Sequence, residues 1–283
     1  MSPHVVKIEP ERLKDLKAQL LKSKGATESK ATSKYEQFRI KERGQTIIAY
    51  TSGKVVASGD SAEASLQNAI RTVYEKSKTE GLTIGSDEAG KGEWLGPMVI
   101  AAVAIDSTQS ASLRSMGVMD SKNLKPERIQ SLAERIEELS RAYRIVLISP
   151  KAFNERFAEF HREGKNLNDL LAWGHAKAVS EVHSGLKGKE VRVVIDEFST
   201  LKTKLRLERV LDIDSIVLIQ RPHAEDEIAV AAASILARSA RETWIDRESV
   251  RLRIDLRRLD SKVVLQRSDH KSLVKISYLR KQY

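Results

Sequence analysis

The sequence contains no cysteine, and this absence removes a large part of protein chemistry. Disulfide bonds, thiolate metal sites and cysteine nucleophiles all require a sulfur that the chain does not have. Long apolar runs are missing too, since no stretch reaches the roughly 18 uninterrupted apolar residues of a membrane-spanning helix. We therefore expect no membrane partner and no thiol chemistry.

A targeting segment is also missing from the start of the sequence. Residues 1–24 lack the apolar core of a secretory signal. Their basic residues alternate with Glu9, Glu11 and Asp15, unlike the acid-poor presequences of organelle import. These features predict a cytoplasmic location.

The composition is that of an ordinary folded protein with a basic surface. Apolar residues make up 41% of the 283 residues and charged residues 31%, which excludes a disordered or fibrous chain. The formal net charge is +10. Such a charge favours a polyanionic partner, because lysine and arginine release condensed counterions from nucleic-acid phosphates. A generally basic, soluble surface is the alternative reading.

A polar run at residues 76–81 predicts two domains, residues 1–80 and 81–283. Alternating apolar residues in the first domain predict strands at 4–8, 35–40, 45–50 and 54–58. Helices are expected from Pro10 to Leu20 and from Asp60 or Ser61 onward, and a polar loop from Ser23 to Lys34. The first domain is therefore expected to be a small α+β unit with a curved antiparallel sheet.

The second domain alternates strands with helices. Strands are expected at 82–87, 98–105, 144–149, 191–195 and 215–219, the first two forming a hairpin around a glycine-rich loop. Helices are expected at about 126–143, 167–183 and 227–245. This order predicts an α/β sandwich with a helix layer on at least one face of the sheet.

Two adjacent acids, Asp87 and Glu88, end the first strand of this domain and run into glycines. Burying an ionised carboxylate costs roughly several kcal/mol of desolvation, unless a cation or hydrogen bonds compensate. Neighbours on a regular strand point to opposite faces, so the pair shares one site only if the strand ends, twists or bulges there. Gly90 and Gly92 permit that distortion.

A second acid, Asp196, follows the apolar strand at 191–195, and an acidic run, Glu225-Asp226-Glu227, precedes an alanine-rich helix. Ligands of α/β folds gather where strands end, so Asp87 and Asp196 are candidates for one cation site. Asp196 as a simple turn or helix cap is an equally weighted alternative. For the acidic run, stabilisation of the helix dipole is the alternative.

Carboxylates without cysteine or a histidine cluster favour Mg²⁺ or Mn²⁺ over zinc. Two such ions about 4 Å apart activate water and stabilise the leaving oxygen in phosphoryl chemistry, and they need little besides carboxylates. The pattern therefore indicates a metal-dependent enzyme that acts on phosphate esters.

Four segments in order resemble the motifs of type 2 ribonucleases H: DEAGKGEWLGPMVIAAV from residue 87, DSKNL from 120, VVIDEF from 193 and AEDEIAVAAASILAR from 224. Within that group the chain most resembles ribonuclease HIII, through NLNDLLAWGHAKA at 166–178 and through IIAY and SGKVVASG at 47–59. The closing LVKISYLRK weakly resembles the end of the family. The resemblance implies a ribonuclease H-like mixed sheet with flanking helices, plus a TATA-binding-protein-like N-terminal domain that binds substrate.

The resemblance also implies site residues. Four metal-binding and catalytic acids are carried over as Asp87, Glu88, Asp196 and Glu225, with Asp226 an alternative to Glu225 because the segment before Ser234 is one residue shorter than in many relatives. The loop Gly90-Lys91-Gly92 is expected to meet the phosphate backbone of the substrate. Lys91 resembles the basic residue of ribonuclease HII more than the small polar one of HIII, so the preference for junctions stays open. The region after Asp246 is shorter and more basic than in either branch.

Other residues carry two readings each. Lys122 is a substrate ligand or a surface lysine, and His175 is better read as a packed or solvated histidine than as a catalytic one. In the first domain a phosphate-binding surface is one reading of the lysines, with two aromatics as stacking candidates; these residues are Lys7, Lys34, Lys41, Lys54, Phe38 and Tyr50. For the aromatics, membership of the core is the commoner case.

These observations together predict an endoribonuclease that hydrolyses the RNA strand of RNA/DNA hybrids with two Mg²⁺ or Mn²⁺ ions, leaving 3′-hydroxyl and 5′-phosphate ends. We expect a monomer without an organic cofactor. A ribonuclease HII-like enzyme that incises single ribonucleotides in DNA is the alternative within the same chemistry. A non-catalytic nucleic-acid-binding protein is the alternative from another class.

Overall fold

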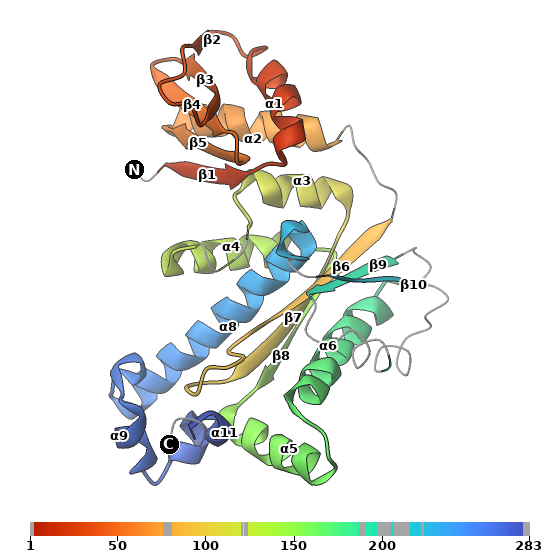
Figure 1. The fold of residues 1–283 in the computed structure, drawn as a ribbon, viewed down its shortest axis with the longest axis vertical. Coiled ribbons are helices and arrows are strands. Elements are labelled where there is room, and N and C mark those ends of the chain that lie inside the picture. Colours follow the sequence, from red (N-terminus) through yellow and green to blue (C-terminus); the bar gives the residue numbers. More distant parts are fainter. Residues whose placement is uncertain are drawn as a thin grey trace. The chain divides into compact units, whose positions relative to one another are not determined.

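The computed structural model describes residues 3–75, 81–119, 121, 124–186, 191–196, 205, 216–221 and 224–279. The chain divides into two compact units (Figure 1). The first consists of Met1–Gly81 and Ile105–Met119, and the second of Leu82–Ala104 and Asp120–Tyr283.

The first unit is built on a five-stranded antiparallel sheet in the order β1-β5-β4-β3-β2. Its strands are β1 (His4–Lys7), β2 (Ala26–Ser29), β3 (Glu36–Glu42), β4 (Gln45–Tyr50) and β5 (Lys54–Ser58). The turn between β3 and β4 places Arg43 and Gly44 at positive φ, the backbone of a two-residue type I′ turn. Its twist matches that of the flanking strands, so the turn sets their register.

Strand β2 lies inside the segment for which we predicted a polar loop, Ser23 to Lys34, so that prediction is wrong there. The strand pairs with β3 at the edge of the sheet, from Ala26 opposite Glu42 to Ser29 opposite Arg39. None of its residues is buried. Backbone hydrogen bonds to β3 hold the strand in place. Because these bonds do not depend on the side chains, the sequence of β2 shows no alternation of apolar residues.

Helices cover one face of this sheet. A 3₁₀ turn (Pro10–Arg12) leads into α1 (Leu13–Leu20), and α2 (Asp60–Glu75) follows β5. Alternate strand residues, among them Phe38 and Ile47, pack with Leu16 and Leu66 of the helices in one core. Phe38 is only 2% exposed, so it is a core residue and cannot stack on a base.

Helix α3 (Ser107–Ser115) was not predicted, and it packs with the first unit although its chain follows a strand of the second. His4 contacts the carbonyl oxygen of Ser115 at 2.9 Å through Nε2, and Arg114 forms an ion pair with Glu9 at 3.1 Å. The predicted domain of residues 81–283 therefore differs from the observed second unit, which lacks residues 105–119.

The second unit contains a mixed five-stranded sheet in the order β10-β9-β6-β7-β8. The strands are β6 (Leu82–Ala89), β7 (Met98–Ile105), β8 (Ala142–Ile148), β9 (Val191–Asp196) and β10 (Ile216–Arg221). β9 lies between β6 and β10 and is parallel to both, whereas β7 and β8 are antiparallel. The predicted α/β class with a mixed sheet is confirmed.

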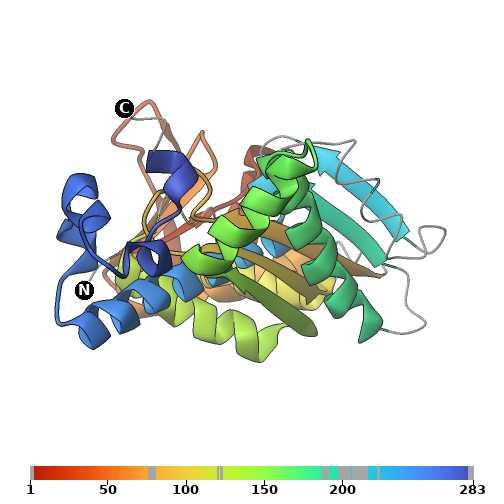
Figure 2. The same cartoon turned by 90° about the horizontal axis from the view of Figure 1, so that it is seen from below.

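Helices lie on both faces of this sheet (Figure 2). α8 (Ile228–Leu252) and α4 (Pro126–Leu139) cover one face, and α6 (Leu167–Ser184) and α5 (Pro150–Arg162) lie on the other. The contact of β6 with α8 is very close, because a Cβ atom on Gly85 would lie 2.1 Å from the Ala229 backbone. Only glycine allows the helix to approach the strand in this way.

Several boundaries in the second unit differ from the predicted ones. α4 ends at Leu139 rather than Tyr143, because Ser140 is extended and β8 already pairs with β7 from Ala142. Helix α5 was missed, although Ser149 caps it and Pro150 opens it. After α8 the described part of the chain contains a 3₁₀ helix (Leu256–Arg258) and three short helices, α9 (Ser261–Leu265), α10 (His270–Leu273) and α11 (Ile276–Leu279).

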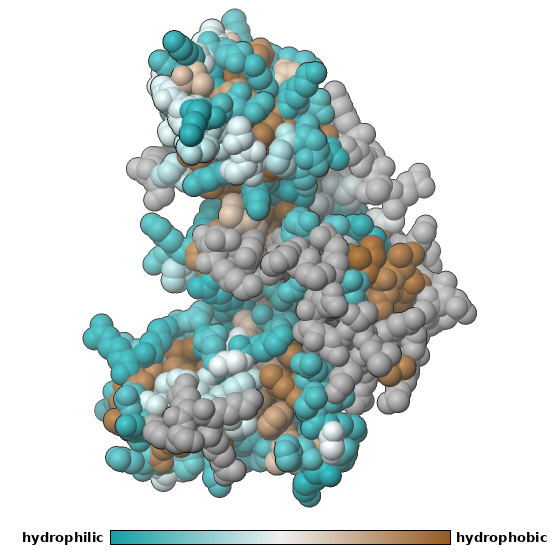
Figure 3. Space-filling view, in the orientation of Figure 1, coloured by the Kyte–Doolittle hydropathy of each residue, from teal (hydrophilic) through white to brown (hydrophobic). Residues whose placement is uncertain are grey.

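Hydrophilic residues predominate on much of the visible surface of both units (Figure 3). Over the described part of the chain, we find no helix with the length and apolar character needed to cross a membrane.

Candidate active site

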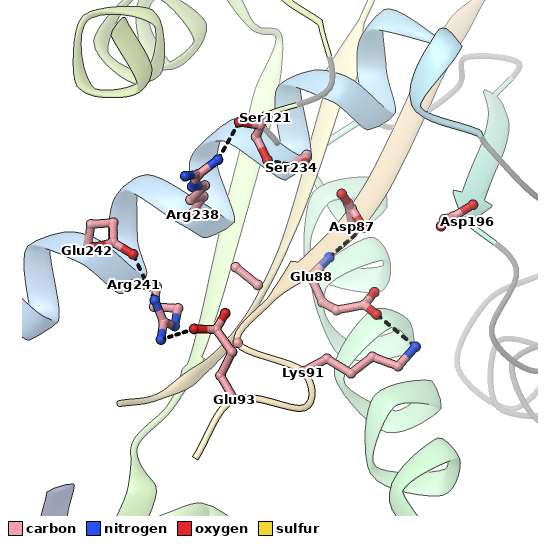
Figure 4. A pocket seen from close by; sticks show the side chains of 12 residues that line it. Asp87, Glu88, Lys91, Glu93, Ser121, Asp196, Ser234, Arg238, Arg241 and Glu242 are labelled. Atoms are coloured by element: carbon pink, nitrogen blue, oxygen red, sulfur yellow. Dashed lines mark hydrogen bonds and ion pairs between the residues drawn. The ribbon is translucent and has the colours of Figure 1, made fainter. Parts of the chain in front are cut away.

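A polar pocket of about 570 Å³ opens in the second unit at the end of β6 (Figure 4). Strands β6 and β9, the loop after β6, and helix α8 all contribute to its walls. The residues that line it are Asp87, Glu88, Ala89, Gly90, Lys91, Glu93, Ser121, Asp196, Ser234, Arg238, Arg241 and Glu242. It thus gathers three of the four predicted acids with two arginines.

Asp87 and Asp196 occupy equivalent positions on neighbouring parallel strands. The last paired residues of β6 and β9 are Ser86 and Ile195, so each aspartate is the next residue of its strand. Asp87 hydrogen-bonds Ser234 of α8, and Asp196 accepts a hydrogen bond from the Ala224 amide at 3.2 Å, just before α8. The predicted convergence of the two strand ends is therefore present in the structure.

Asp87 and Glu88 leave opposite faces of β6. Asp87 points towards α8, whereas Glu88 reaches His175 of α6. We expected the strand to end or bulge at the acids; instead β6 continues through Ala89, while its pairing with β9 stops at Ser86. Both carboxylates line one pocket because they stand beyond the part of β6 that pairs with β9.

The Asp87 carboxylate is buried among like charges. Only 8% of the residue is exposed. Burial raises the pKa of Asp87, and the charge of Glu88 raises it further, with a smaller contribution from Asp196. The hydrogen bond from Ser234 acts in the opposite direction. Negative charge on Asp87 is thus unfavourable unless a cation is nearby.

Glu88 is in a different electrostatic environment. Burial opposes its ionisation, but the contact with His175 and the charge of Lys91 outweigh burial and lower the pKa of Glu88. The Nε2 atom of His175 lies 3.1 Å from Glu88 Oε2, and the Lys91 ammonium lies 3.2 Å from Glu88 Oε1. Two cationic or donor groups therefore hold Glu88 as a carboxylate.

The loop after β6 requires glycine at two positions. Gly90 and Gly92 have φ of +83° and +79°, a region that side chains rarely adopt. A Cβ atom on Gly90 would also lie 2.4 Å from the Pro97 carbonyl oxygen and 3.2 Å from the Arg241 side chain. The expected Gly90-Lys91-Gly92 loop is thus tightly folded, and Gly90 and Lys91 line the pocket.

The remaining predicted residues are placed only in part. Glu225 belongs to the 3₁₀ turn Ala224–Asp226, but its side chain lies outside the described atoms; Asp226 is exposed. Lys122 also lies outside the described residues. Within the residues whose side chains are described, no three acidic or imidazole groups surround one point as metal ligands do.

Sequence reasoning missed several residues of the site. His175 was read as a packing residue, and it is fully buried, yet both its nitrogens face polar partners, Ser86 at 2.8 Å and Glu88 at 3.1 Å. Ser121 lies 2.8 Å from Ser234, which in turn bonds Asp87. The only sequence signal for His175 was a polar residue within an apolar helix face, and this signal does not distinguish a packed histidine from one that contacts an acid.

Two family models match the chain. Residues 84–258 match the model described as Ribonuclease HII, and residues 3–80 match a Domain of unknown function (DUF3378). The chain is 38% identical over 234 residues to Ribonuclease HIII of Protochlamydia amoebophila (strain UWE25), covering 78% of this chain and 74% of that protein. Ribonuclease HIII of Chlamydia pneumoniae is 35% identical over 212 residues, covering 72% and 69%.

Solved structures share the fold over almost the whole chain. A crystal structure of Bst-RNase HIII in complex with Mn²⁺ matches with a TM-score of 0.61 at 23% identity, covering 98% of this chain and 96% of that one. RNase H3 of Aquifex aeolicus matches with a TM-score of 0.55 at 21% identity, covering 97% and 99%. At these identities the likeness concerns the fold, and it includes both units.

Proposed function

Because this chain belongs to the ribonuclease HIII family and is a metal-dependent ribonuclease H, we propose that it cleaves the RNA strand of RNA/DNA hybrids internally, leaving 3′-hydroxyl and 5′-phosphate ends. One observation supports this most strongly: Asp87 and Asp196 stand side by side on parallel strands, with Glu88 in the same pocket. Such a carboxylate cluster suits metal-assisted phosphodiester hydrolysis.

The donor atoms of the pocket fit hard divalent cations. Asp87, Glu88 and Asp196 offer oxygen only, and the nearby imidazole of His175 is engaged by Ser86 and Glu88. The crowding that raises the pKa of Asp87 is what a cation would relieve. We assign the binding of two Mg²⁺ or Mn²⁺ ions to Asp87, Glu88, Asp196 and Glu225, with Asp226 as the alternative fourth ligand. Bound there, the ions supply Lewis-acid chemistry for in-line displacement at phosphorus.

Neighbouring side chains hold the carboxylates in place. Ser234 binds Asp87 and is itself joined to Ser121, whose carbonyl oxygen accepts a hydrogen bond from Arg238. His175 does the same for Glu88 from the opposite face of the sheet. Asp87 and Glu88 therefore have fixed orientations before substrate arrives, which lowers the cost of assembling the site.

The substrate contacts are assigned to two places. In the second unit, Gly90, Lys91 and Gly92 are assigned to the phosphate backbone near the scissile bond, and Lys122 is assigned to the same site. In the first unit, the sheet face opposite α1 and α2 carries exposed lysines from neighbouring strands. Lys7 of β1 stands directly opposite Lys54 of β5.

This lysine pair supports a substrate-binding role for residues 1–80, which make up most of the first unit. Like charges directly opposite each other destabilise a sheet, so their presence on adjoining strands is best explained by an anionic partner. Lys41 and the half-buried Tyr50 are on the same open face. We propose that this surface binds the backbone of the hybrid, and that the enzyme acts as a monomer without an organic cofactor.

Lys91 favours a second candidate within the same chemistry. Lys91 lines the pocket beside Glu88, with its ammonium 3.2 Å from Glu88 Oε1. A basic group in this place meets a substrate phosphate, as expected of a ribonuclease HII-like enzyme that incises single ribonucleotides in DNA. A matched assay separates the two. Comparable or faster cleavage of a duplex with one ribonucleotide than of a long hybrid supports the second candidate.

Replacement of Asp87 with Asn tests the main proposal. The variant keeps the size of the side chain and loses the charge, so we expect Mg²⁺- and Mn²⁺-dependent cleavage to fall by at least about 1,000-fold. Binding of a fluorescent hybrid, measured without metal, should change by less than about threefold. A variant that keeps most of its activity would contradict the assignment of Asp87.

A further inference from the structure

The loop that joins β6 to β7 is held by its carbonyl groups. Three successive carbonyls accept hydrogen bonds: Trp94 O from the Lys275 amide at 2.8 Å, Leu95 O from Arg241 Nη2 at 3.1 Å, and Gly96 O from Lys275 Nζ at 2.5 Å. The Gly96 amide in turn donates to Leu273 O at 2.9 Å. Residues 94–96 therefore pair with the C-terminal segment almost like a strand.

Arg241 and Lys275 approach this loop from different elements. Arg241 comes from α8, is only 7% exposed, and also pairs with Glu93 at 2.5 Å. Its side chain lies against Gly90, at 3.2 Å from the position of a Cβ atom. Lys275 lies between α10 and α11 and is fully buried. Two buried basic side chains thus fix the end of the loop whose beginning lines the pocket.

Asn154 of α5 holds the C-terminal segment in position. Its Nδ2 donates to Val274 O at 2.9 Å and to Lys271 O at 3.2 Å, and its Oδ1 accepts from the Ile276 amide at 2.9 Å. Tyr278 stacks on Phe153 with ring centroids 5.8 Å apart. The backbone on both sides of Lys275 is therefore bound to helix α5, which lies on one face of the sheet.

A buried lysine at this position is costly for stability. Burial lowers the pKa of Lys275 to about 7, and the nearby charge of Arg241 contributes in the same direction. An apolar side chain would fill the same space without that cost. An apolar residue cannot supply the hydrogen bond to Gly96 O, or the contact of the ammonium with the Phe153 ring, whose centroid lies 5.9 Å away.

We infer that Lys275 is a positioning residue for the active-site loop: with Arg241 it fixes the loop carbonyls so that Gly90 and Lys91 stand ready for a substrate phosphate. The C-terminal segment, residues 271–279, is then part of the active-site architecture although none of its residues lines the pocket. This inference rests on the proposed hydrolysis of RNA/DNA hybrids.

The test compares Lys275→Met with Lys151→Met, which changes an exposed lysine of α5 outside the C-terminal segment. For the full-length Lys275→Met protein we expect the KM for a defined hybrid to rise about tenfold, while kcat changes less than about threefold. The control should keep the KM of the unchanged protein. Equal KM values for Lys275→Met and the unchanged protein would overturn the inference.

Asn154→Ala provides a second route if Lys275→Met fails to fold. This variant leaves Lys275 in place and releases the backbone around it, and we expect the KM to rise in the same direction. A folded Asn154→Ala protein with normal KM and normal kcat overturns the inference as well. Folding is checked by circular dichroism before either assay.

A double-mutant cycle separates positioning from general loosening. If Lys275 acts through the loop, the fold-increase in KM of the double variant Lys275→Met, Lys91→Ala is smaller than the product of the fold-increases of the two single variants. Strict multiplicativity speaks against the inference. Failure of the unchanged protein to cleave any hybrid would instead contradict the proposed function, so the two failures are distinguishable.

Discussion

The Nε2 atom of His175 lies 3.1 Å from a carboxylate oxygen of Glu88, across the face of the sheet opposite Asp87. Its Nδ1 atom lies 2.8 Å from the Ser86 hydroxyl, so the ring is held at both ends. The residue is fully buried and is not among the residues that line the active-site pocket. His175 therefore belongs to the active site through Glu88 and not through the substrate.

Replacement of His175 with Ala should weaken metal binding. Without the imidazole, Glu88 loses one of its two partners, keeps only Lys91, and becomes harder to ionise in a buried position. We expect the Mn²⁺ concentration for half-maximal cleavage to rise by about tenfold or more. His175→Gln, which keeps a donor, should recover part of the loss, and His183→Ala on the same helix serves as the control. An unchanged metal requirement in His175→Ala would count against this role.

Lys275 should make the stability of the protein depend on pH. Its folded pKa of about 7 lies below the ordinary value of 10.5, so between these values the unfolded chain binds more protons than the folded one. Stability therefore rises with pH across that window. Lys275→Met removes this dependence, because methionine does not titrate.

Between about pH 6 and pH 10 we expect the free energy of unfolding of the unchanged protein to rise by a few kcal/mol relative to that of Lys275→Met. Urea unfolding at several pH values measures it. Parallel curves for the two proteins would show that Lys275 titrates normally.

Gly85→Ala should destabilise the second unit strongly. The added Cβ atom would stand 2.1 Å from the carbonyl carbon of Ala229 and 2.2 Å from the Val230 amide, both backbone atoms of α8. Helix and strand must separate, and we expect a loss of about 3 kcal/mol or more in the free energy of unfolding. Activity should fall with it, because α8 carries Ser234.

Gly185→Ala is the matched control for that experiment. Its Cβ atom would meet only the Val182 carbonyl oxygen at 3.5 Å, an ordinary contact. We expect a change within about 0.5 kcal/mol. Thermal unfolding of both variants decides the point, and equal midpoints would contradict the close approach of β6 and α8.

Lys54→Ala should weaken binding of the hybrid without changing the chemistry. If Lys54 contacts a phosphate, its removal raises the dissociation constant roughly threefold to tenfold and lowers the slope of log K against log salt by about one. Lys14→Ala changes an exposed lysine on α1, on the covered side of the sheet, and should leave both quantities unchanged. Equal effects of the two variants would argue against a binding surface on the open face.

The sequence predicts those parts of the site that follow from strand ends. Asp87 and Asp196 each come directly after a buried apolar strand, and parallel pairing makes such residues neighbours. His175 could not be assigned in this way, because its partner Glu88 is 87 positions away and the contact depends on how α6 packs on β6. An interior polar residue on an apolar helix looks the same in either case.

The same contrast holds for the fold. Strands β4 and β5 coincide with their predicted ranges because apolar alternation and a glycine turn mark them. β2 lacks that alternation, since an edge strand is held by backbone hydrogen bonds to one neighbour. For α3 a capping box formed by Asp106 and Gln109 is present, but no local signal says that the helix packs with the first unit.

The placement of α3 means that a single cut cannot separate the two units. A protein that begins at Leu82 would keep α3 but lose His4 and Glu9, the residues that bind Ser115 and Arg114. The side of α3 that packs with the first unit would then face water and promote aggregation. Any loss of hybrid binding would therefore combine two effects, the missing binding surface and the newly exposed helix. Clean excision has to remove residues 105–119 as well and rejoin β7 to the chain before α4.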